Sequence, residues 1–238
     1  MTTYYKLLNE DGTTPQGYGT WFLPKRQGRL GKWMPAIRGK LIGCRNGYHV
    51  LKTADLLEWY GPVLWELEIR GNPVRSKGDN KTIVRQARLI RKVEEWNDQT
   101  LRMVAADFAE RGLLIFEAQN PADGRVRKTI GVIRAYARGE ATKRELDAAR
   151  DAARDVLETS SAAARVAAYA AVYATTRIAA RDATEAAARR AWAAARAVRA
   201  AAWAAAEDDA EDDAGAARAA ERRWQQKRLK QYLEGKAV

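Results

Sequence analysis

The chain has 238 residues, enough for one large domain or two small ones. It contains 42 Lys and Arg against 30 Asp and Glu, and the net charge of +12 favours anionic partners such as nucleotides, nucleic acid or acidic proteins. It lacks both the run of about eighteen apolar residues that a membrane span requires and, near its start, the apolar stretch of a signal peptide. A single cysteine cannot form an internal disulfide. Together with the lack of apolar segments, it favours a cytoplasmic protein, in the cytoplasm of the host cell if the protein is phage-encoded.

Charge and apolar pattern both change near residue 97. Residues 1–97 carry 17 Lys and Arg against 9 acids, or +8, whereas residues 98–238 carry 25 against 21, or +4. The apolar period changes from about two residues to about 3.6 at the same point. We therefore expect an α+β fold, with a basic mixed domain over 1–97 and an alanine-rich helical domain over 98–238.

The first part predicts short strands separated by turns. The segment "VLWELEIRG" alternates, with apolar residues on one face and Glu66 and Glu68 on the other, as in a half-buried strand. A helix is expected over 53–61, with Thr53 as its N-cap and Gly61-Pro62 at its end. Further strands are expected over 2–9, 47–51 and 81–96. The last of these segments also fits a helix, but as a strand it aligns more apolar residues, with Arg85 and Arg91 on the apolar side.

From Asp98 onward the pattern is helical. Apolar residues recur on one face from Leu101 to Phe116, and "NPADG" ends this helix. The next helix is expected to end at Gly139. Thr142 and Glu145 then have the spacing of a capping box, in which two side chains satisfy backbone donors at a helix start.

The segment 159–206 is rich in alanine. On a helical wheel a narrow stripe carries Arg189, Trp192, Arg196, Arg199 and Trp203. The opposite face carries Ala187, Ala191, Ala194, Ala201 and Ala205. We favour close packing of this alanine face against a neighbouring helix, which could also support homo-oligomers, over use of the Trp/Arg stripe as a stacking surface for bases.

Six acids precede Gly215 within residues 207–215, and a basic helix is expected after this glycine. Acids near the start of a helix and cations near its end suit the helix dipole. The acidic run lacks the spacing of an EF-hand loop, so no calcium site is expected.

Roughly residues 3–93 contain, in order, "YYKLLNEDGTTPQG", "GKLIGCRNGYHVL", "LLEWYGPVLWELEIRG" and "KTIVRQARLIRKVEEWN". This order resembles a domain of unknown function that is common in phage and actinobacterial genomes. Its core is a Gly-Tyr-His motif after a cysteine, here Cys44 and Gly47 to His49, followed by a strand ending in Glu-x-x-Gly, here Glu68 to Gly71. The resemblance implies a phage setting and an architecture, but no reaction.

Roughly residues 100–205 contain "MVAADFAERGLLIFE", "ADGRVRKTIGVIRAYARGE" and "AARDAARD". These motifs resemble an alanine-rich helical family of immunity proteins. Members usually have a cysteine and a histidine in the first motif, where this chain has Phe108 and Arg111, so no metal or thiol role is expected there. The resemblance implies a role in phage–host conflict, such as counter-defence.

Cys44 and His49 are the only cysteine and the only histidine. One of each does not supply the three or four ligands of zinc, so no metal site is expected. A thiol nucleophile with a histidine base is one alternative, although residues five apart on a strand face opposite sides. We favour a structural role, with His49 hydrogen-bonded beneath the sheet and Cys44 buried.

An enzyme is the other alternative for His49. A strand with an aromatic-His pair, a helix and a later strand with glutamates is similar to the ADP-ribosyltransferase fold. That similarity implies that His49 would contact NAD and that a glutamate, with Glu68 as a candidate, would complete the chemistry. Glu66, Glu94 and Glu95 fit this role equally well, and no motif chooses among them. We therefore expect no catalytic residue and no cofactor.

The first 97 residues also contain a cluster of cations interleaved with Trp21 and Trp33. Aromatic rings suit base faces and cations suit phosphates. The alternative is a solvated loop whose charges only aid solubility. The candidate ligand-binding residues are Lys25, Arg26, Arg29, Lys32, Trp33, Arg38, Lys40, Arg45, Tyr48 and His49. We expect a non-enzymatic, phage-associated protein that binds a nucleotide, nucleic acid or an acidic protein. The alternatives are the NAD-using enzyme and a structural protein that self-assembles through its alanine-rich helices.

Overall fold

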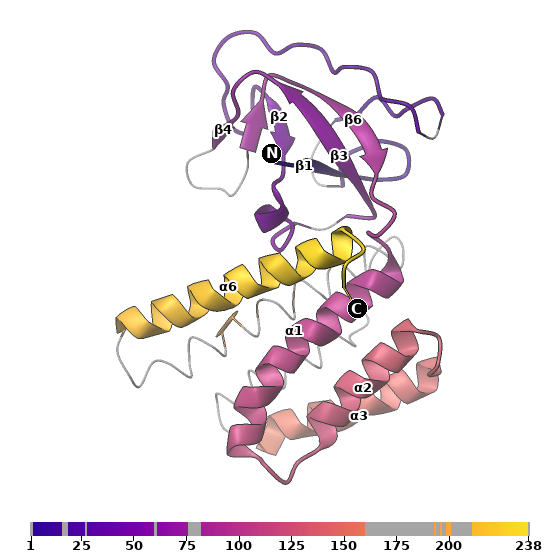
Figure 1. Ribbon diagram of the computed structural model, residues 1–238, viewed down its shortest axis with the longest axis vertical. Coiled ribbons are helices and arrows are strands. Elements are labelled where there is room, and N and C mark those ends of the chain that lie inside the picture. The colour runs from indigo at the N-terminus through magenta and orange to yellow at the C-terminus, as the bar shows by residue number, and fades with distance from the viewer. Residues whose placement is uncertain are drawn as a thin grey trace. The chain divides into compact units, whose positions relative to one another are not determined.

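The computed structural model describes residues 2–15, 19–26, 28–59, 61–75, 82–159, 193, 196, 199, 200 and 211–237. The chain divides into two compact units, Met1–Trp96 and Asn97–Val238. Within the described ranges, all strands lie in the first unit and all α-helices in the second (Figure 1). The α+β fold class that the sequence predicts is confirmed.

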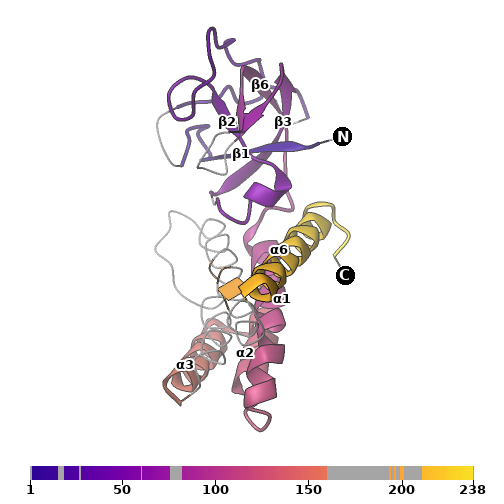
Figure 2. The same ribbon diagram turned by 90° about the vertical axis from the view of Figure 1, so that its left-hand side faces the viewer.

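The strands of the first unit form two antiparallel sheets (Figures 1 and 2). One sheet has the order β1-β3-β6, with β1 at Tyr4–Leu8, β3 at Val63–Arg70 and β6 at Gln86–Lys92. The other has the order β2-β5-β4, with β2 at Tyr48–Val50, β5 at Thr82–Val84 and β4 at Val74–Arg75. All four strand segments expected from the sequence are confirmed, and the last of them supplies both β5 and β6.

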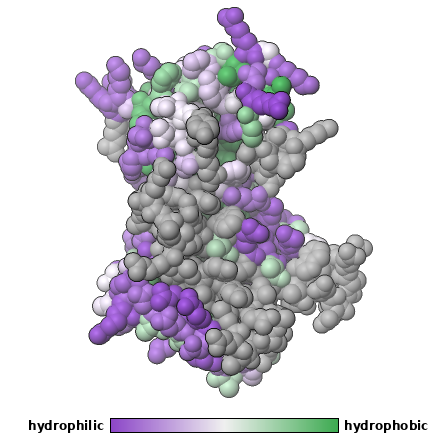
Figure 3. All heavy atoms as spheres, turned by 180° about the vertical axis from the view of Figure 1, so that it is seen from behind, coloured by the Kyte–Doolittle hydropathy of each residue, from purple (hydrophilic) through white to green (hydrophobic). Residues whose placement is uncertain are grey.

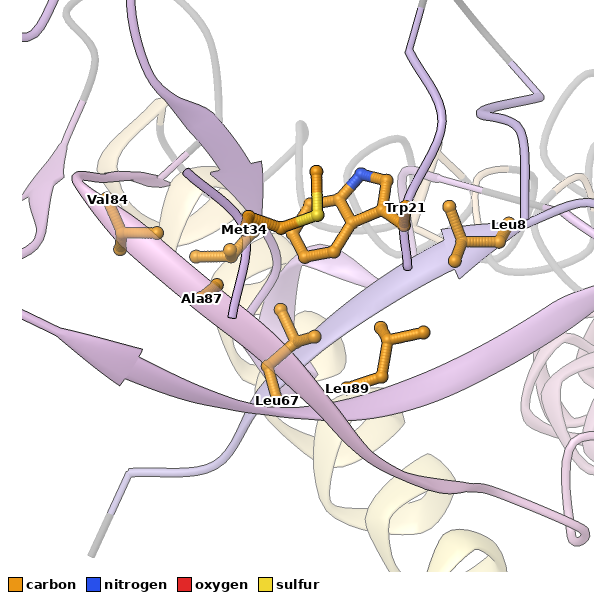
Figure 4. Packing of buried hydrophobic residues seen from close by; sticks show 8 residues of the cluster. Leu8, Trp21, Met34, Leu67, Val84, Ala87 and Leu89 are labelled. Atoms are coloured by element: carbon orange, nitrogen blue, oxygen red, sulfur yellow. The ribbon is translucent and has the colours of Figure 1, made fainter. Parts of the chain in front are cut away.

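The two sheets enclose one hydrophobic core. Only Arg85 separates β5 from β6, so one extended stretch of chain contributes to both sheets. A second link joins the two sheets: Tyr5 of β1 and Leu51, just after β2, exchange two backbone hydrogen bonds of 2.7 and 2.8 Å. The buried cluster between the sheets consists of Leu8, Trp21, Met34, Val50, Leu67, Val84, Ala87 and Leu89 (Figure 4).

A register shift in β6 keeps Arg91 out of this core. Leu67 of β3 pairs with Leu89, but the preceding residue, Glu66, pairs with Arg91, so Ile90 is the extra residue of a bulge. Leu89 is fully buried, whereas Arg91 stands beside Glu66 and forms an ion pair of 2.6 Å with it. Strict alternation places Arg91 on the apolar side, and the bulge removes this conflict.

The segment after β2 forms only a short 3₁₀ helix, Thr53–Asp55, within the residues expected to be helical. Its N-cap is Lys52, so the prediction of Thr53 as the cap is wrong. The buried carboxylate of Asp55 accepts a hydrogen bond of 2.9 Å from the Lys52 N–H and two more from Arg75 of β4. Asp55 closes the turn because its carboxylate satisfies the first backbone donor.

The described helices of the second unit are α1 at Asp98–Gln119, α2 at Arg125–Ala137, α3 at Lys143–Thr159 and α6 at Glu211–Leu233. Asn97 is the N-cap of helix α1, and its side chain accepts a hydrogen bond of 2.9 Å from the N–H of Thr100. Helices α2 and α3 lie side by side (Figures 1 and 2), and the Thr129 hydroxyl donates to the carbonyl of Ala149 across them. Helix α1 packs against α2 and α6.

Two helix-boundary predictions are confirmed. Gly139 follows the end of α2 with a left-handed φ of 79°, where a side chain would be strained. At the start of α3, the N–H of Glu145 donates to the Thr142 hydroxyl, and the Glu145 carboxylate accepts from the N–H of Thr142. This reciprocal pair is the capping box that the spacing indicates.

The last helix differs from its prediction. Helix α6 includes Glu211 and continues through Gly215, so the glycine lies inside the helix and does not precede it. Most of the alanine-rich segment lies outside the described residues. That applies to the alanine face (Ala187, Ala191, Ala194, Ala201 and Ala205) and to Arg189, Trp192 and Trp203 of the opposite stripe. Of the helices that the structure describes, none has both the length and the apolar character needed to cross a bilayer.

Candidate nucleic-acid interface

The most unusual feature of the first unit is a long stretch without acids. Residues 12–54 contain eight Lys and Arg and no Asp or Glu. Seven of these cations lie between residues 22 and 45, which we call the basic segment. Their side chains are all exposed, and they are Lys25, Arg26, Arg29, Lys32, Arg38, Lys40 and Arg45.

These seven cations differ from other cations of the same unit. Within the described residues none of the seven side chains forms an ion pair or a hydrogen bond. In contrast, Arg75, Arg88 and Arg91 pair with Asp55, Glu68 and Glu66. Positive charge that has no internal partner is free to meet an external anion.

Two buried side chains anchor the basic segment. Trp21 lies just before it and Met34 lies within it, and both belong to the core (Figure 4). Between and beyond these anchors the chain follows the free edge of β6 through three backbone hydrogen bonds of 2.8 to 2.9 Å. The donors are Gly31, Met34 and Ile37, and the acceptors are Leu89, Ala87 and Arg85. Lys32 therefore projects from a backbone that is fixed on both sides of it, at Gly31 and at Met34.

Side-chain donors hold the second part of the basic segment. The Nη1 of Arg85 donates to the carbonyls of Ile37 and Gly39, at 3.1 and 2.7 Å. The Nδ2 of Asn46 donates to the carbonyls of Arg38 and Lys40, at 3.0 and 2.8 Å. Four consecutive carbonyls are thus engaged, and this orders the backbone that carries Arg38 and Lys40.

Exposed apolar side chains accompany the cations. Of the five large hydrophobic side chains that are exposed among the described residues, three lie in the basic segment: Phe22, Leu30 and Ile42, at 45 to 51% exposure. In Figure 3, hydrophilic side chains protrude from this unit and hydrophobic patches lie between them. Such a mixture of cations and exposed apolar groups is typical of surfaces that bind a partner.

The two tryptophans do not match the expectation that they offer free faces to bases. Trp21 is 5% exposed and packs edge-on against Tyr48 in the core. Trp33 is half-buried, and the guanidinium groups of Arg70 and Arg88 lie 4.0 and 4.6 Å from its ring centroid. Trp21 is therefore unavailable for stacking, and Trp33 already holds two cations against its ring.

His49 has a local structural partner. Its Nε2 accepts a hydrogen bond of 3.0 Å from the N–H of Cys44, which fixes the neutral ring with its proton on Nδ1. Cys44 is exposed and adopts a left-handed φ of 60°, so the expectation that it is buried is wrong. It occupies the turn between Ile42 and Asn46, where the chain reverses and no sheet covers it.

The other enzymatic candidate, Glu68, lies on a different sheet from His49. Its carboxylate accepts a hydrogen bond of 2.7 Å from Nε of Arg88 and forms an ion pair with this guanidinium. Tyr48 donates its hydroxyl to the carbonyl of Pro35 at 2.8 Å, and burial raises the pKa of this phenol. Across the described ranges, no three or more His, Cys, Asp or Glu side chains come together as metal ligands.

The sequence contained a signal for this surface that periodicity did not use. The absence of acids from 43 consecutive residues marks the basic segment more sharply than the charge of the whole domain does. Arg85 donates to main-chain carbonyls that lie 46 and 48 residues away in sequence, and Asn46 donates to carbonyls six and eight residues away within an irregular loop, so no spacing rule indicates their roles. No protein-family model, curated protein or solved structure matches this chain.

Proposed function

We propose that this protein binds single-stranded nucleic acid through the basic segment, without catalysing a reaction. The observation that carries the proposal is the set of seven exposed, unpartnered cations on an acid-free stretch that the core and β6 hold in place. Each cation that meets a phosphate releases condensed counterions, and this favours binding.

The distribution of the cations supports a polymer over a single nucleotide. Lys25, Arg26 and Arg29 lie before the contact of the segment with β6, whereas Arg38, Lys40 and Arg45 lie after it. A nucleotide carries its phosphates at one end, but a single strand presents a phosphate at every residue. The seven cations before, within and after the anchored stretch outnumber the phosphates of one nucleotide, and a strand offers a phosphate for each of them.

Phe22 supports single-stranded over double-stranded nucleic acid. It is the one aromatic side chain among the strongly exposed hydrophobic residues of the described chain, and Lys25 and Arg26 follow it closely. A base that stacks on an exposed ring contributes about 1 to 3 kcal/mol. Bases within a duplex do not offer this face, because they stack on one another.

The setting of this activity rests on the resemblances of the two parts of the chain. The first part resembles a domain found in phage and actinobacterial genomes, and the second resembles a family of immunity proteins. We infer that the protein acts in the bacterial cytoplasm during phage–host conflict, where single-stranded nucleic acid arises in replication and transcription.

The test measures the affinity of the full chain for single-stranded DNA, single-stranded RNA and duplex DNA by fluorescence anisotropy. Replacing Lys25, Arg26 and Arg29 together by Ala should weaken single-strand binding by more than tenfold, because three phosphate contacts are lost. The control is Arg91→Ala, which removes an exposed cation that Glu66 already pairs with. Equal affinities of the triple variant and the unchanged protein would contradict the proposal, as would preference for duplex DNA.

A further inference from the structure

The second unit contains a charged pocket that the nucleic-acid proposal does not involve. It lies among α1, α2 and α6 and has a volume of about 320 Å³. This volume is at the lower end of the range for small-molecule sites. The lining residues are Asp107, Glu110, Arg111, Arg134, Trp224, Lys227, Arg228 and Gln231.

Asp107 organises the wall of the pocket. This buried carboxylate accepts hydrogen bonds from Arg134 of α2 at 2.8 Å, from Arg228 of α6 at 2.6 Å and from the Tyr232 hydroxyl at 2.8 Å. One carboxylate of α1 therefore connects three helices. Since both of its oxygens are engaged, its charge is neutralised toward the pocket.

Glu110, the second acid of the lining, is paired as well. Its two oxygens accept hydrogen bonds of 3.1 and 2.6 Å from Nη1 and Nη2 of Arg134. These bonds lower the pKa of Glu110 despite partial burial, so the carboxylate stays ionised at neutral pH. Arg134 thus neutralises acids, and the other three cations of the lining face the pocket.

Those three cations retain unused donors. Arg111 donates through Nε to Glu221 at 3.0 Å, and its Nη1 and Nη2 have no partner among the described residues. Arg228 uses Nε for Asp107 and Nη1 for Gln231, and its guanidinium lies 4.9 Å from the Tyr232 ring centroid, so Nη2 is the nitrogen for which no hydrogen bond is seen among the described residues. Lys227 is exposed, and its Nζ makes no bond within the described chain. Four nitrogen donors therefore line one pocket without a partner.

The pocket also has a rigid apolar wall. Trp224 is half-buried, its ring meets Phe108 edge-on at 6.2 Å between centroids, and the Arg111 guanidinium lies 4.8 Å from the ring centroid. Stacking on Trp224 and the bond to buried Glu221 fix the Arg111 guanidinium in position. A fixed guanidinium with two free N–H groups matches two oxygens of an oxyanion.

We propose that this pocket binds a small molecule that carries a phosphate group. Arg111, Lys227 and Arg228 would donate to the phosphate oxygens, and Trp224 would contact the rest of the molecule. A phosphate has three terminal oxygens and up to two negative charges, so it uses four converging donors more fully than a carboxylate does. With Glu221 included, four cations face three acids, so the pocket has a net positive charge that favours an anion.

The test is isothermal titration calorimetry of the full chain with inorganic phosphate, ribose 5-phosphate, adenosine monophosphate and succinate. At least one phosphate-bearing probe should bind, and Lys227→Met should weaken its binding about tenfold, because one charge-assisted hydrogen bond is lost. Lys230→Met is the matched control, since Lys230 is an exposed lysine of the same helix that pairs with Glu234. Binding of inorganic phosphate alone would show that the pocket recognises only the phosphate group. Tighter binding of either ester would show that Trp224 also contacts the rest of the molecule.

Three results would overturn the proposal: no heat with any phosphate probe at millimolar concentration, binding of succinate alone, or equal effects of the two lysine variants. The variant with Lys25, Arg26 and Arg29 replaced by Ala separates this site from the basic segment. That variant should weaken single-strand binding and leave phosphate binding unchanged, whereas Lys227→Met should weaken phosphate binding and leave single-strand binding unchanged. Failure of either proposal therefore leaves the other open to its own test.

Discussion

The main-chain N–H of Cys44 donates a hydrogen bond of 3.0 Å to Nε2 of His49. The bond links the turn between residues 42 and 46, in which Cys44 has a left-handed φ of 60°, to strand β2. It occupies the lone pair that a catalytic base would need to accept a proton. The geometry therefore favours a structural role for His49, which is to hold the turn that carries Arg45.

Replacing His49 by Ala should lower the free energy of unfolding by about 1 kcal/mol, because the Cys44 N–H loses its acceptor. Thermal unfolding followed by circular dichroism measures this effect. Cys44→Ala is the control, since it keeps the main-chain donor and should change stability less. A folded His49→Ala protein that has lost an NAD-consuming activity of the unchanged protein would show that His49 is catalytic.

Gly47 should not tolerate a side chain. Its φ is 148°, and a Cβ atom there would lie 2.1 Å from Cγ2 of Ile83, which is 2% exposed and cannot move aside. Gly47→Ala should therefore destabilise the first unit by at least about 2 kcal/mol, through strain and overpacking together. Urea unfolding provides the measurement.

Gly39→Ala is the matched control for this prediction. Gly39 also has a left-handed φ, of 74°, but no atom lies within 4 Å of the added Cβ. It should lose only about 1 kcal/mol, the conformational part of the effect. Equal losses for the two variants would show that contact with Ile83 is unimportant.

Alternation and turn residues predicted the strands of the first unit because one face of each strand is buried. The same rules placed Arg91 on the apolar side, since nothing in the local pattern announces that Ile90 is the extra residue of a bulge. The bulge brings Arg91 opposite Glu66, which lies 25 residues away in sequence, and the two side chains pair there. Such a pairing is visible only once the register of the two strands is known.

The candidate surface was predicted in part. The exposed cations follow from composition, because lysine and arginine seldom lie in a core. Composition does not predict that the faces of the two tryptophans are covered. Trp21 packs into the cluster of buried residues from both sheets, and Trp33 is covered by Arg70 and Arg88 from two different strands. The phosphate pocket was not predicted, because Asp107 meets Arg228 across 121 residues.

Tyr232 should make the stability of the second unit sensitive to high pH. Burial is the largest cause that raises the pKa of this phenol, and the charge of Asp107 adds to it. The folded state therefore keeps a proton that the unfolded state loses near pH 10, so the stabilisation is complete below about pH 10 and falls as pH rises further.

Tyr232→Phe tests the predicted loss of stability as pH rises above 10. At pH 7 the variant should be less stable by about 1 kcal/mol, since the hydrogen bond to Asp107 is lost. Above pH 10 the difference between the two proteins should shrink, because only the unchanged protein has this phenol. Urea unfolding at pH 7 and pH 10.5, followed by helical circular dichroism, gives both values. A difference that grows with pH would contradict the assignment.

Salt should weaken nucleic-acid binding in proportion to the cations that contact phosphates. For single strands the logarithm of the affinity falls with the logarithm of salt concentration, with a slope of about 0.7 per phosphate contact. Arg38 is exposed, unpartnered and fixed through its own carbonyl by Asn46, so Arg38→Ala should reduce the slope by about 0.7.

Asn46→Ala should weaken binding while it preserves the slope more fully, because the cations remain and only the backbone that presents them loosens. Anisotropy titrations with one labelled oligonucleotide at five salt concentrations give these slopes. Arg91→Ala changes the net charge as much as Arg38→Ala does and should leave the slope unchanged, so equal slopes for these two variants would exclude a direct phosphate contact by Arg38.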